Sequence, residues 1–403
     1  MPSLTNASHD PLPSSAWNIF LVFLRLGLTS FGGPVAHIGY FREEFVRRRQ
    51  WLDEHSYADL VALCQFLPGP SSSQVGIAIG LLRGGYSGSL AAWAGFTLPS
   101  AIALLLLSLG IANWGNGLSE GLLHGLKIVA VAVVAQAVWG MARSLCPDGP
   151  RLAMALIAAL AVLILPGAWA QLGVIVLAGL MGVALFRPAA TIAAPAFLSR
   201  TSNLIGITAL ISFFVLLAVL PLLAAASSSQ ALALLDAFYR AGALVFGGGH
   251  VVLPLLQAEV VPSGWVNNDV FLAGYGAAQA VPGPLFTFSA FLGGSVAGGN
   301  GPVLNAALCL VAIFIPSFLL VFGVMPFWDR LRTNRRIQAA LTGVNAAVVG
   351  LLLAALYDPV WTSAIHSLKD FALGLVALVA LMRWKLPPWL VVLTGGIAGW
   401  ALA

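Results

Sequence analysis

The chain has 403 residues, of which 60% are hydrophobic and 8% are charged, and its mean hydropathy is +0.95. A soluble domain carries about 25% charged residues, so this composition excludes a water-exposed surface over most of the chain. The apolar runs are continuous rather than alternating, which is typical of membrane helices and excludes a β-barrel. The net charge of +5 comes from basic residues in short loops between apolar runs, so it indicates membrane topology and no nucleic-acid partner.

Apolar segments long enough to cross about 30 Å of lipid hydrocarbon follow one another along the chain. We expect full membrane spans at 87–111, 121–143, 151–166, 169–187 and 202–224, and then at 302–326, 336–356, 369–383 and 387–402. The predicted fold is therefore an all-α polytopic membrane protein in a lipid bilayer. The stretch 188–201 is the expected loop between the halves, and 224–229 is an expected outer loop.

One sequence pattern occurs twice in the chain. The first copy contains Arg25, Phe31-Gly32-Gly33, Trp51, Gln65-x-x-Pro68-Gly69-Pro70 and Pro99-Ser100. The second copy contains Arg240, Phe246-Gly247-Gly248, Trp265, Gln279-x-x-Pro282-Gly283-Pro284 and Pro316-Ser317. Repeated segments rich in helix breakers are typical of membrane transporters. We therefore predict a first repeat at 15–187, a linker with one connecting transmembrane helix at 188–231, and a second repeat at 232–402.

The segments around these motifs are too short to span a bilayer. Residues 57–68 and 70–83 would form helices about 18 and 21 Å long at 1.5 Å per residue, and a Pro-Gly-Pro joint separates them. The corresponding segments of the second copy are 270–281 and 284–299, while 16–33 and 232–250 end in glycine clusters. We predict re-entrant or broken helices at the Phe-Gly-Gly and Pro-Gly-Pro motifs of both copies.

The basic residues indicate that the two repeats have opposite orientations in the membrane. If the motif segments of the first copy enter from the cytoplasm, the full spans that follow leave the second copy on the other side. Every Lys and Arg then lies in the cytoplasm except Lys369, which is outside, and Arg25, Lys127 and Arg240, which lie at membrane depth. A parallel second copy would place the basic cluster at 330–336 outside, against the positive-inside rule. We therefore predict inverted-topology repeats in the cytoplasmic membrane.

The Pro-Gly-Pro joints are candidate anion-binding sites. Proline prevents a helix through the joint and suits the start of the next helix, whose first N–H groups point back into the joint. Such N–H groups, at the positive end of the helix dipole, bind anions. The candidate substrate-binding residues here are Gln65, Pro68, Gly69, Pro70, Ser71 and Ser72 in the first copy, and Gln279, Pro282, Gly283, Pro284 and Thr287 in the second. The alternative is that each joint only shapes helix packing.

Glycine clusters and basic residues at membrane depth extend this candidate site. Successive glycines can form an anion-binding nest or can simply let helices pack closely. A charge at membrane depth marks a functional candidate, with snorkelling to the headgroups or, for Arg240, pairing with Asp236 as the alternative. The further substrate-binding candidates are Gly32, Gly33, Pro34, Gly247, Gly248, Arg25, Arg240 and Lys127.

Two histidines beside the glycine clusters, His37 and His250, are candidates for proton coupling, because histidine titrates near physiological pH. Simple hydrogen bonding is the alternative. The cysteines Cys64, Cys146 and Cys309 have no metal-ligand spacing, and no phosphate-loop or dinucleotide motif occurs. We therefore expect no metal, no cofactor and no catalytic residue.

These motifs resemble the chromate ion transporter family in its long, two-domain bacterial form. The resemblance rests on Gly32-Gly33-Pro34, on 65–70 and on their second copies, where Gly249 replaces Pro34. It implies export of chromate, a divalent tetrahedral oxyanion that mimics sulfate, by ion-gradient-driven secondary transport that gives chromate resistance. Import of sulfate or another oxyanion and a passive anion channel are the alternatives, while a membrane-embedded enzyme lacks the expected motifs. The flux direction, the coupling ion and a homodimeric state stay open.

Overall fold

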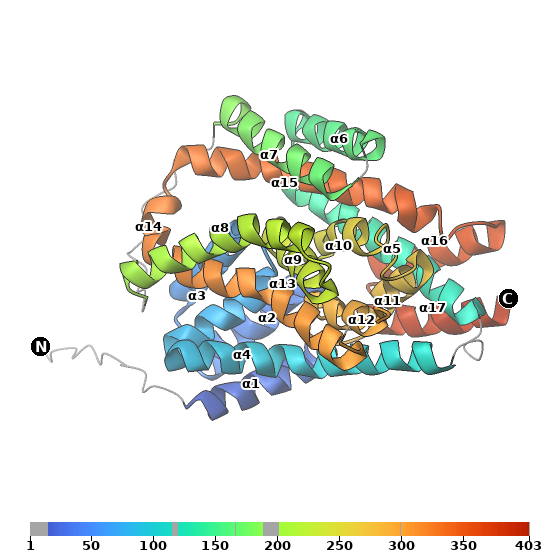
Figure 1. The fold of residues 1–403 in the computed structure, drawn as a ribbon, viewed down its shortest axis with the longest axis horizontal. Coiled ribbons are helices and arrows are strands. Elements are labelled where there is room, and N and C mark those ends of the chain that lie inside the picture. Colours follow the sequence, from blue (N-terminus) through green and yellow to red (C-terminus); the bar gives the residue numbers. More distant parts are fainter. Residues whose placement is uncertain (1–14, 115–119, 166, 188–200, 299, 403) are drawn as a thin grey trace, which may run out of the picture.

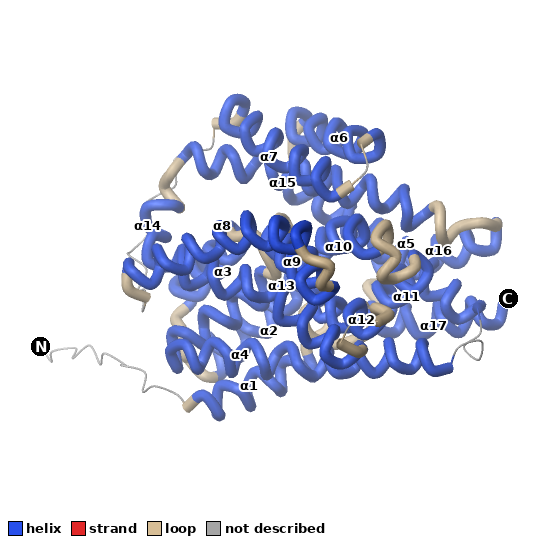
Figure 2. Tube along the Cα trace, viewed as in Figure 1, coloured by secondary structure: helices blue, strands red, loops and turns tan. Residues whose placement is uncertain are grey.

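The computed structural model of the protein describes residues 15–114, 120–165, 167–187, 201–298 and 300–402. Across these ranges the chain forms helices joined by turns and loops, without β-strands (Figure 2). The predicted all-α fold is confirmed. The expected loop at 188–201 lies outside the described residues except for its last position, and so do residues 166 and 299 at the ends of two expected segments.

The first half of the chain begins with short helices and continues with longer ones. Its helices are α1 (Ala16–Thr29), α2 (Gly33–Arg42), η1 (Glu43–Arg48), α3 (Glu54–Phe66), α4 (Ser71–Trp114), α5 (Glu120–Leu145), α6 (Gly149–Ile164) and α7 (Ala168–Leu185). Helix α4 is interrupted at Gly84 and Gly85, which have non-helical backbone angles. This interruption lies between the expected half-helix 70–83 and the expected span 87–111.

The second half follows the same order after one long connecting helix, α8 (Asn203–Ala226). Its helices are α9 (Gln230–Leu244), η3 (Gly249–Val251), α10 (Val252–Val260), α11 (Asn268–Ala278), η4 (Leu285–Thr287), α12 (Phe288–Ser295), α13 (Pro302–Val324), η5 (Met325–Phe327), α14 (Trp328–Leu331), α15 (Arg335–Ala355), η6 (Leu356–Trp361), α16 (Leu368–Met382) and α17 (Pro388–Leu402). The expected outer loop at 224–229 is shorter than predicted, because α8 runs to Ala226 and α9 begins at Gln230.

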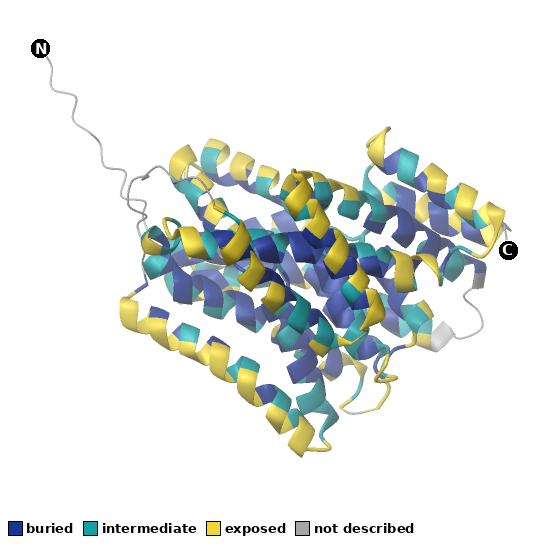
Figure 3. Cartoon of the chain, turned by 90° about the horizontal axis from the view of Figure 1, so that it is seen from above, coloured by how far each residue is buried: buried dark blue, intermediate teal, exposed yellow. Residues whose placement is uncertain are grey.

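Several helices have the length and composition of membrane spans. Within the described ranges, the 6 that are long and apolar enough are Ser71–Ala112, Gly121–Leu145, Ala168–Leu185, Asn203–Ala226, Pro302–Leu331 and Arg335–Trp361. Helices α6, α16 and α17 were also expected to span but have only 15 or 16 residues, or about 23 Å of helix. Exposed residues run along the outer helices (Figure 3), and many of them are large and apolar. Such faces suit lipid, and the chain is a multi-pass membrane protein.

The two halves of the chain are interlocked. Helix α5 of the first half packs against α11, α16 and α17 of the second, while α15 of the second half packs against α6 and α7 of the first (Figure 1). Small residues permit this close approach. A Cβ added at Gly125 would overlap the Gly395 carbonyl, and one added at Gly182 would overlap the Ala339 carbonyl. Each half therefore completes its packing with helices of the other.

Glycines with positive φ interrupt the chain at each motif. Gly69 has φ 121° between α3 and α4, and Gly283 has φ 99° between α11 and η4. Gly32, with φ 100°, lies between α1 and α2, and Gly247, with φ 74°, follows α9. A residue with a Cβ rarely adopts such backbone angles. The helices thus end where the motifs predicted breaks, whereas re-entry from one membrane side and the inverted orientation of the repeats stay predictions.

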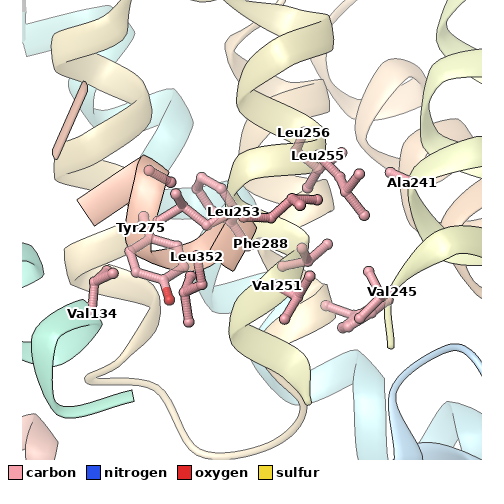
Figure 4. Packing of buried hydrophobic residues seen from close by; sticks show 14 of the residues in the cluster. Val134, Ala241, Val245, Val251, Leu253, Leu255, Leu256, Tyr275, Phe288 and Leu352 are labelled. Carbon is pink, nitrogen blue, oxygen red and sulfur yellow. The ribbon is translucent and has the colours of Figure 1, made fainter. Parts of the chain in front are cut away.

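A cluster of buried apolar residues surrounds the motif segments of the second half (Figure 4). Tyr275 of α11, Phe288 of α12, Leu352 of α15 and Val134 of α5 all belong to it. Because these side chains come from both halves, the cluster fixes the position of the short helices relative to the long ones. The short helices are too short to be stable by themselves, and this packing supports them.

Candidate functional site

The helix breaks of the two halves meet through two reciprocal hydrogen bonds. The Gly69 N–H donates to the Val245 carbonyl at 2.6 Å, and the Gly283 N–H donates to the Ser30 carbonyl at 2.9 Å. Ser30 follows the last residue of α1, and Val245 follows the last residue of α9. Each Pro-Gly-Pro joint is therefore bonded to the glycine break of the other half. We call this arrangement the crossing.

Equivalent serines of the two halves lie next to the two joint glycines of the crossing. A Cβ added at Gly283 would lie 2.8 Å from Ser100 Oγ, and one added at Gly69 would lie 3.0 Å from Ser317 Oγ. The distance at Gly283 is too short for a real Cβ, and a Cβ at Gly69 would also lie 2.7 Å from Gln74 Nε2, which is the end of a flexible side chain. The backbone angles favour glycine at both joints, and at Gly283 the available space does so as well.

A cavity of about 460 Å³ lies beside the crossing. Residues of both halves line it, among them Phe31, Gly32, Gly33, Pro34, Tyr40 and Gln136 of the first half and His250, Gln279, Gly283, Leu285 and Lys385 of the second. A water molecule takes up about 30 Å³ of the liquid. The cavity, which we call the central cavity, therefore has room for a small hydrated ion.

Three helical segments begin at the wall of the central cavity. Gly33 begins α2, Gly249 begins η3, which continues into α10, and Leu285 begins η4, which continues into α12. A Cβ at Gly249 would lie 3.5 Å from Pro34 Cγ and 3.8 Å from Leu285 Cβ, so these beginnings are close together. The first N–H groups of a helix lack partners within the helix and carry the positive end of its dipole. This arrangement favours an anion.

Polar side chains add donors and one full positive charge to the central cavity. The Gln279 side-chain Nε2 is buried and makes no hydrogen bond of good geometry among the described residues, and the Gln279 side chain lies close to the Tyr275 hydroxyl. His250 Nδ1 lies 2.8 Å from the Tyr275 hydroxyl. Lys385 is exposed at the cavity and has φ 53°, an unusual conformation for a residue other than glycine. The cavity can therefore offer N–H donors and an ammonium group to a bound anion.

The central cavity brings together only part of the predicted site. It is lined by the candidates Gly32, Gly33, Pro34, Gln279, Gly283 and His250. Pro282 and Pro284 adjoin Gly283, but the Thr287 hydroxyl donates to the Pro284 carbonyl at 2.7 Å and is thereby used. Gly247 packs against the side chains of Leu145 and Met141, and Gly248 lies near Met141. The Gln65 side chain is exposed and is not part of the lining.

The joint of the first copy forms a separate, buried polar cluster. His37 Nε2 lies 3.2 Å from the Ser30 carbonyl, and its Nδ1 lies 3.3 Å from Ser72 Oγ. The Gln74 side-chain amide donates to the Pro68 carbonyl at 2.7 Å. His37 thus connects the glycine break to the serine-rich start of α4, where Pro70 and Ser71 also lie. These contacts give His37 the hydrogen-bonding role, and its proton-coupling role stays a prediction.

None of the three basic residues expected at membrane depth lines the central cavity. Arg25 is on the exposed face of α1, beside exposed Leu21 and Leu28. Lys127 Nζ is 2.9 Å from Asp269 Oδ1, in another cavity. The position of Arg25 favours snorkelling of its side chain to the lipid headgroups, which was the alternative to substrate binding.

Arg240 is paired with carboxylates inside the protein. Its side chain is 11% exposed and lies 2.7 Å from Asp236 Oδ2 and 3.1 Å from Glu259 Oε2. Its guanidinium also lies 5.2 Å from the centre of the Trp169 ring. Arg240 therefore pairs with Asp236, which was the alternative to substrate binding, and Glu259 is its second partner. Two carboxylates offset its charge, which leaves little for a bound anion.

Three polar residues of the central cavity, Tyr40, Gln136 and Lys385, were not among the predicted site residues. Gln136 could have been noticed, because it is a polar residue in the middle of the apolar run 121–143. Lys385 was used only as a topology signal, although it precedes Pro387-Pro388 and lines the cavity. Tyr40 carries no comparable signal in the sequence.

The comparisons with known proteins agree with the repeated motifs. The family described as Chromate transporter matches residues 17–183 and 232–400. The Chromate transport protein of Pseudomonas aeruginosa is 31% identical over 97% of this chain and 93% of that protein. The Probable chromate transport protein of Synechococcus elongatus is 29% identical over 94% and 93%, and the Chromate transport protein of Cupriavidus metallidurans is 28% identical over 91% and 88%. No solved structure gives a significant match. The chain belongs to the chromate transporter family.

Proposed function

We propose that the protein is a secondary active transporter that exports chromate from the cytoplasm and thereby gives chromate resistance. Its relatives from Pseudomonas aeruginosa and Cupriavidus metallidurans are named chromate transport proteins. The observation that carries the proposal is the central cavity, which is lined by motif residues of both copies, Gln279 among them. The substrate is a tetrahedral dianion bound in that cavity.

The donors around the central cavity suit such an anion. The first N–H groups of α2 and of η3, together with Gln279 Nε2, can donate to oxygens that face different directions. Each helix beginning carries only about half a positive charge, so a dianion also needs a full charge. Lys385 supplies it at the cavity mouth. Hydrogen bonds to a charged group are stronger than those between neutral groups, which favours chromate over water.

The central cavity can serve transport if it opens alternately to the cytoplasm and to the outside. Inverted repeats provide two equivalent arrangements, in which segments from opposite membrane sides meet at one site. Lys385 is predicted to be cytoplasmic, so the cavity as described faces the cytoplasm. The crossing bonds at Gly69 and Gly283 join the segments that would have to shift. Loading from the cytoplasm is the step expected of an exporter.

Labelled chromate uptake into everted membrane vesicles tests the proposal. We expect accumulation that depends on an imposed ion gradient, because the cytoplasmic face of everted vesicles is outside. Vesicles containing the Gln279→Leu variant are the matched control and should accumulate less at low chromate concentration. Accumulation only in right-side-out vesicles would favour the importer, and gradient-independent conductance would favour the channel. Competition by unlabelled sulfate measures how far the site distinguishes two tetrahedral dianions.

A further inference from the structure

A second cavity of about 610 Å³ lies toward the other end of α5. His124 and Lys127 of α5 line it, together with Asp269 at the start of α11 and Lys369 and Asp370 at the start of α16. Because Lys369 is predicted to be outside, we call it the outer cavity. His124 and Gln136 are separated by about 18 Å along α5, so one helix contributes to both cavities.

His124 faces a carboxylate that the backbone holds in place. His124 Nε2 lies 2.8 Å from Asp370 Oδ1. The other carboxylate oxygen, Oδ2, accepts the backbone N–H groups of His366 and Ser367 at 3.0 and 2.9 Å. The Asp370 side chain is 13% exposed and that of His124 is 30% exposed. The carboxylate is thus oriented toward the imidazole, which can still be reached from the cavity.

The four charged residues that line the outer cavity, Asp370 included, carry no net charge. Lys127 of α5 is paired with Asp269 of α11, and Lys369 adjoins Asp370 on α16. Helix α17 contributes uncharged Gly399 to the lining, and the His366 ring lies parallel to the His124 ring at 6.1 Å. His124 is the one histidine in the described lining of the outer cavity, so a proton bound there would give the cavity a net positive charge.

We propose that the outer cavity is a proton-binding site, with His124 as the proton carrier, and that α5 couples its loading to anion movement through the central cavity. The proposal rests on the proposed chromate transport and names its coupling ion. In the neutral form, the Nε2–H of His124 donates to Asp370 and the Nδ1 lone pair is available. A proton from the outer solution binds Nδ1 and no other bond breaks. The resulting imidazolium and carboxylate attract each other more strongly and tighten the contact between α5 and α16.

The other two histidine candidates lack this partner. His37 bonds to a carbonyl and a serine hydroxyl, and His250 bonds to the Tyr275 hydroxyl. A protonated imidazole away from water needs a nearby negative charge to be stable. Only His124, among these three, has a carboxylate within hydrogen-bond distance in the described structure.

Purified protein in proteoliposomes, with imposed pH gradients, tests the proton site. Chromate transport is followed together with proton flux from an internal pH dye. The wild type should show chromate-dependent proton flux and at least about a fivefold acceleration by a favourable pH gradient. His124→Gln should lose both effects while equilibrium chromate binding stays within about twofold, which also shows that the variant is folded. His55→Gln, at an exposed histidine of α3, should behave as the wild type.

Asp370→Asn is a second variant in case His124→Gln does not fold. It keeps a carbonyl oxygen for the backbone N–H groups but removes the charge that stabilises the imidazolium, so it should also be uncoupled. If the wild type transports chromate without any proton flux, or if both variants keep the pH-gradient acceleration, the proton site is wrong and the transport function stands. If the wild type transports no chromate under any gradient, the proposed function itself fails.

Discussion

Gln65 and Gln279 occupy the same position in the two copies of the motif but have different surroundings. The Gln279 side chain lines the central cavity with its Nε2 buried, whereas the Gln65 side chain is exposed and lies outside the cavity lining. The two copies therefore contribute unequally, although the sequence makes them equivalent. This difference gives a matched pair of variants.

Gln279→Leu should weaken chromate binding at least about tenfold. It removes a donor to a charged ligand, which contributes roughly 1.5–3 kcal/mol, and about 1.4 kcal/mol corresponds to a tenfold change. The half-saturation concentration for transport in proteoliposomes measures the effect. Gln65→Leu is the control and should change it less than twofold. Equal effects of the two substitutions would contradict the assignment of the central cavity.

Lys385→Gln should raise the half-saturation concentration for chromate and reduce its dependence on salt, because it removes the full positive charge at the cavity mouth.

Arg25→Gln should leave transport unchanged, since Arg25 is on an exposed face of α1. Initial rates at several chromate and salt concentrations distinguish the two variants. Loss of transport in Arg25→Gln with normal expression would restore the substrate-binding role predicted from the sequence.

The residues whose role depends on the local backbone conformation could be identified from the sequence. The glycine clusters, the prolines and Gln279 are recognisable because helix breakers in an apolar chain have few uses. The environments of Arg25 and Arg240 depend on which face of a helix packs inward, and single positions do not reveal this. Lys385 and Tyr40 reach the central cavity from elements far apart in the chain, so no local pattern connects them.

At the scale of elements, the crossing places strict limits on the two joint glycines. Gly283 has φ 99° and faces Ser100 Oγ and the Phe96 carbonyl, at 2.8 and 3.2 Å from an added Cβ. A non-glycine residue at positive φ costs about 1–2 kcal/mol before any steric overlap. The helix breaks are therefore fixed by backbone geometry rather than by lipid.

Gly283→Ala should destabilise the protein by about 2 kcal/mol or more and lower its thermal midpoint in detergent. Gly140→Ala is the control, because Gly140 lies inside α5 with no atom near an added Cβ, and alanine there favours the helix by up to about 1 kcal/mol. Fluorescence-detected size-exclusion chromatography after heating measures both midpoints. An unchanged midpoint in Gly283→Ala would mean that the crossing can relax at little cost.

The expected helices were largely correct, but their partners were not predictable. Continuous apolar runs predicted α5, α7, α8, α13 and α15, and the Pro-Gly-Pro motifs predicted the breaks before α4 and η4. Helices α6, α16 and α17 lie where the apolar runs predicted them, and all three are shorter than the roughly 17 residues that a full span needs. The packing of helices of one half against helices of the other depends on contacts between segments far apart in the chain. A hydrophobic pattern does not encode such contacts.

At the scale of the whole molecule, the inverted repeats predict which loops face the cytoplasm. Single cysteines at Arg47 and at Arg335, in a chain without Cys64, Cys146 and Cys309, should resist an impermeant thiol reagent in intact cells. Both positions are exposed on the protein surface, so protection reflects the membrane. A cysteine at Lys369 should be labelled from outside. Labelling at Arg47 or Arg335 in intact cells would exclude the inverted arrangement.

The interlocked packing has a consequence for how the protein is made. Helix α5 is synthesised in the first half of the chain, yet α11, α16 and α17, which it packs against, belong to the second half. Domains of many proteins fold in order as they leave the ribosome, but α5 has to stay in the membrane without its final neighbours until translation is nearly complete. Lys127 and Gln136 then face lipid or water for that time. A nascent chain stopped before α16 should thus be a preferred target of membrane proteases, and the full-length chain should be spared.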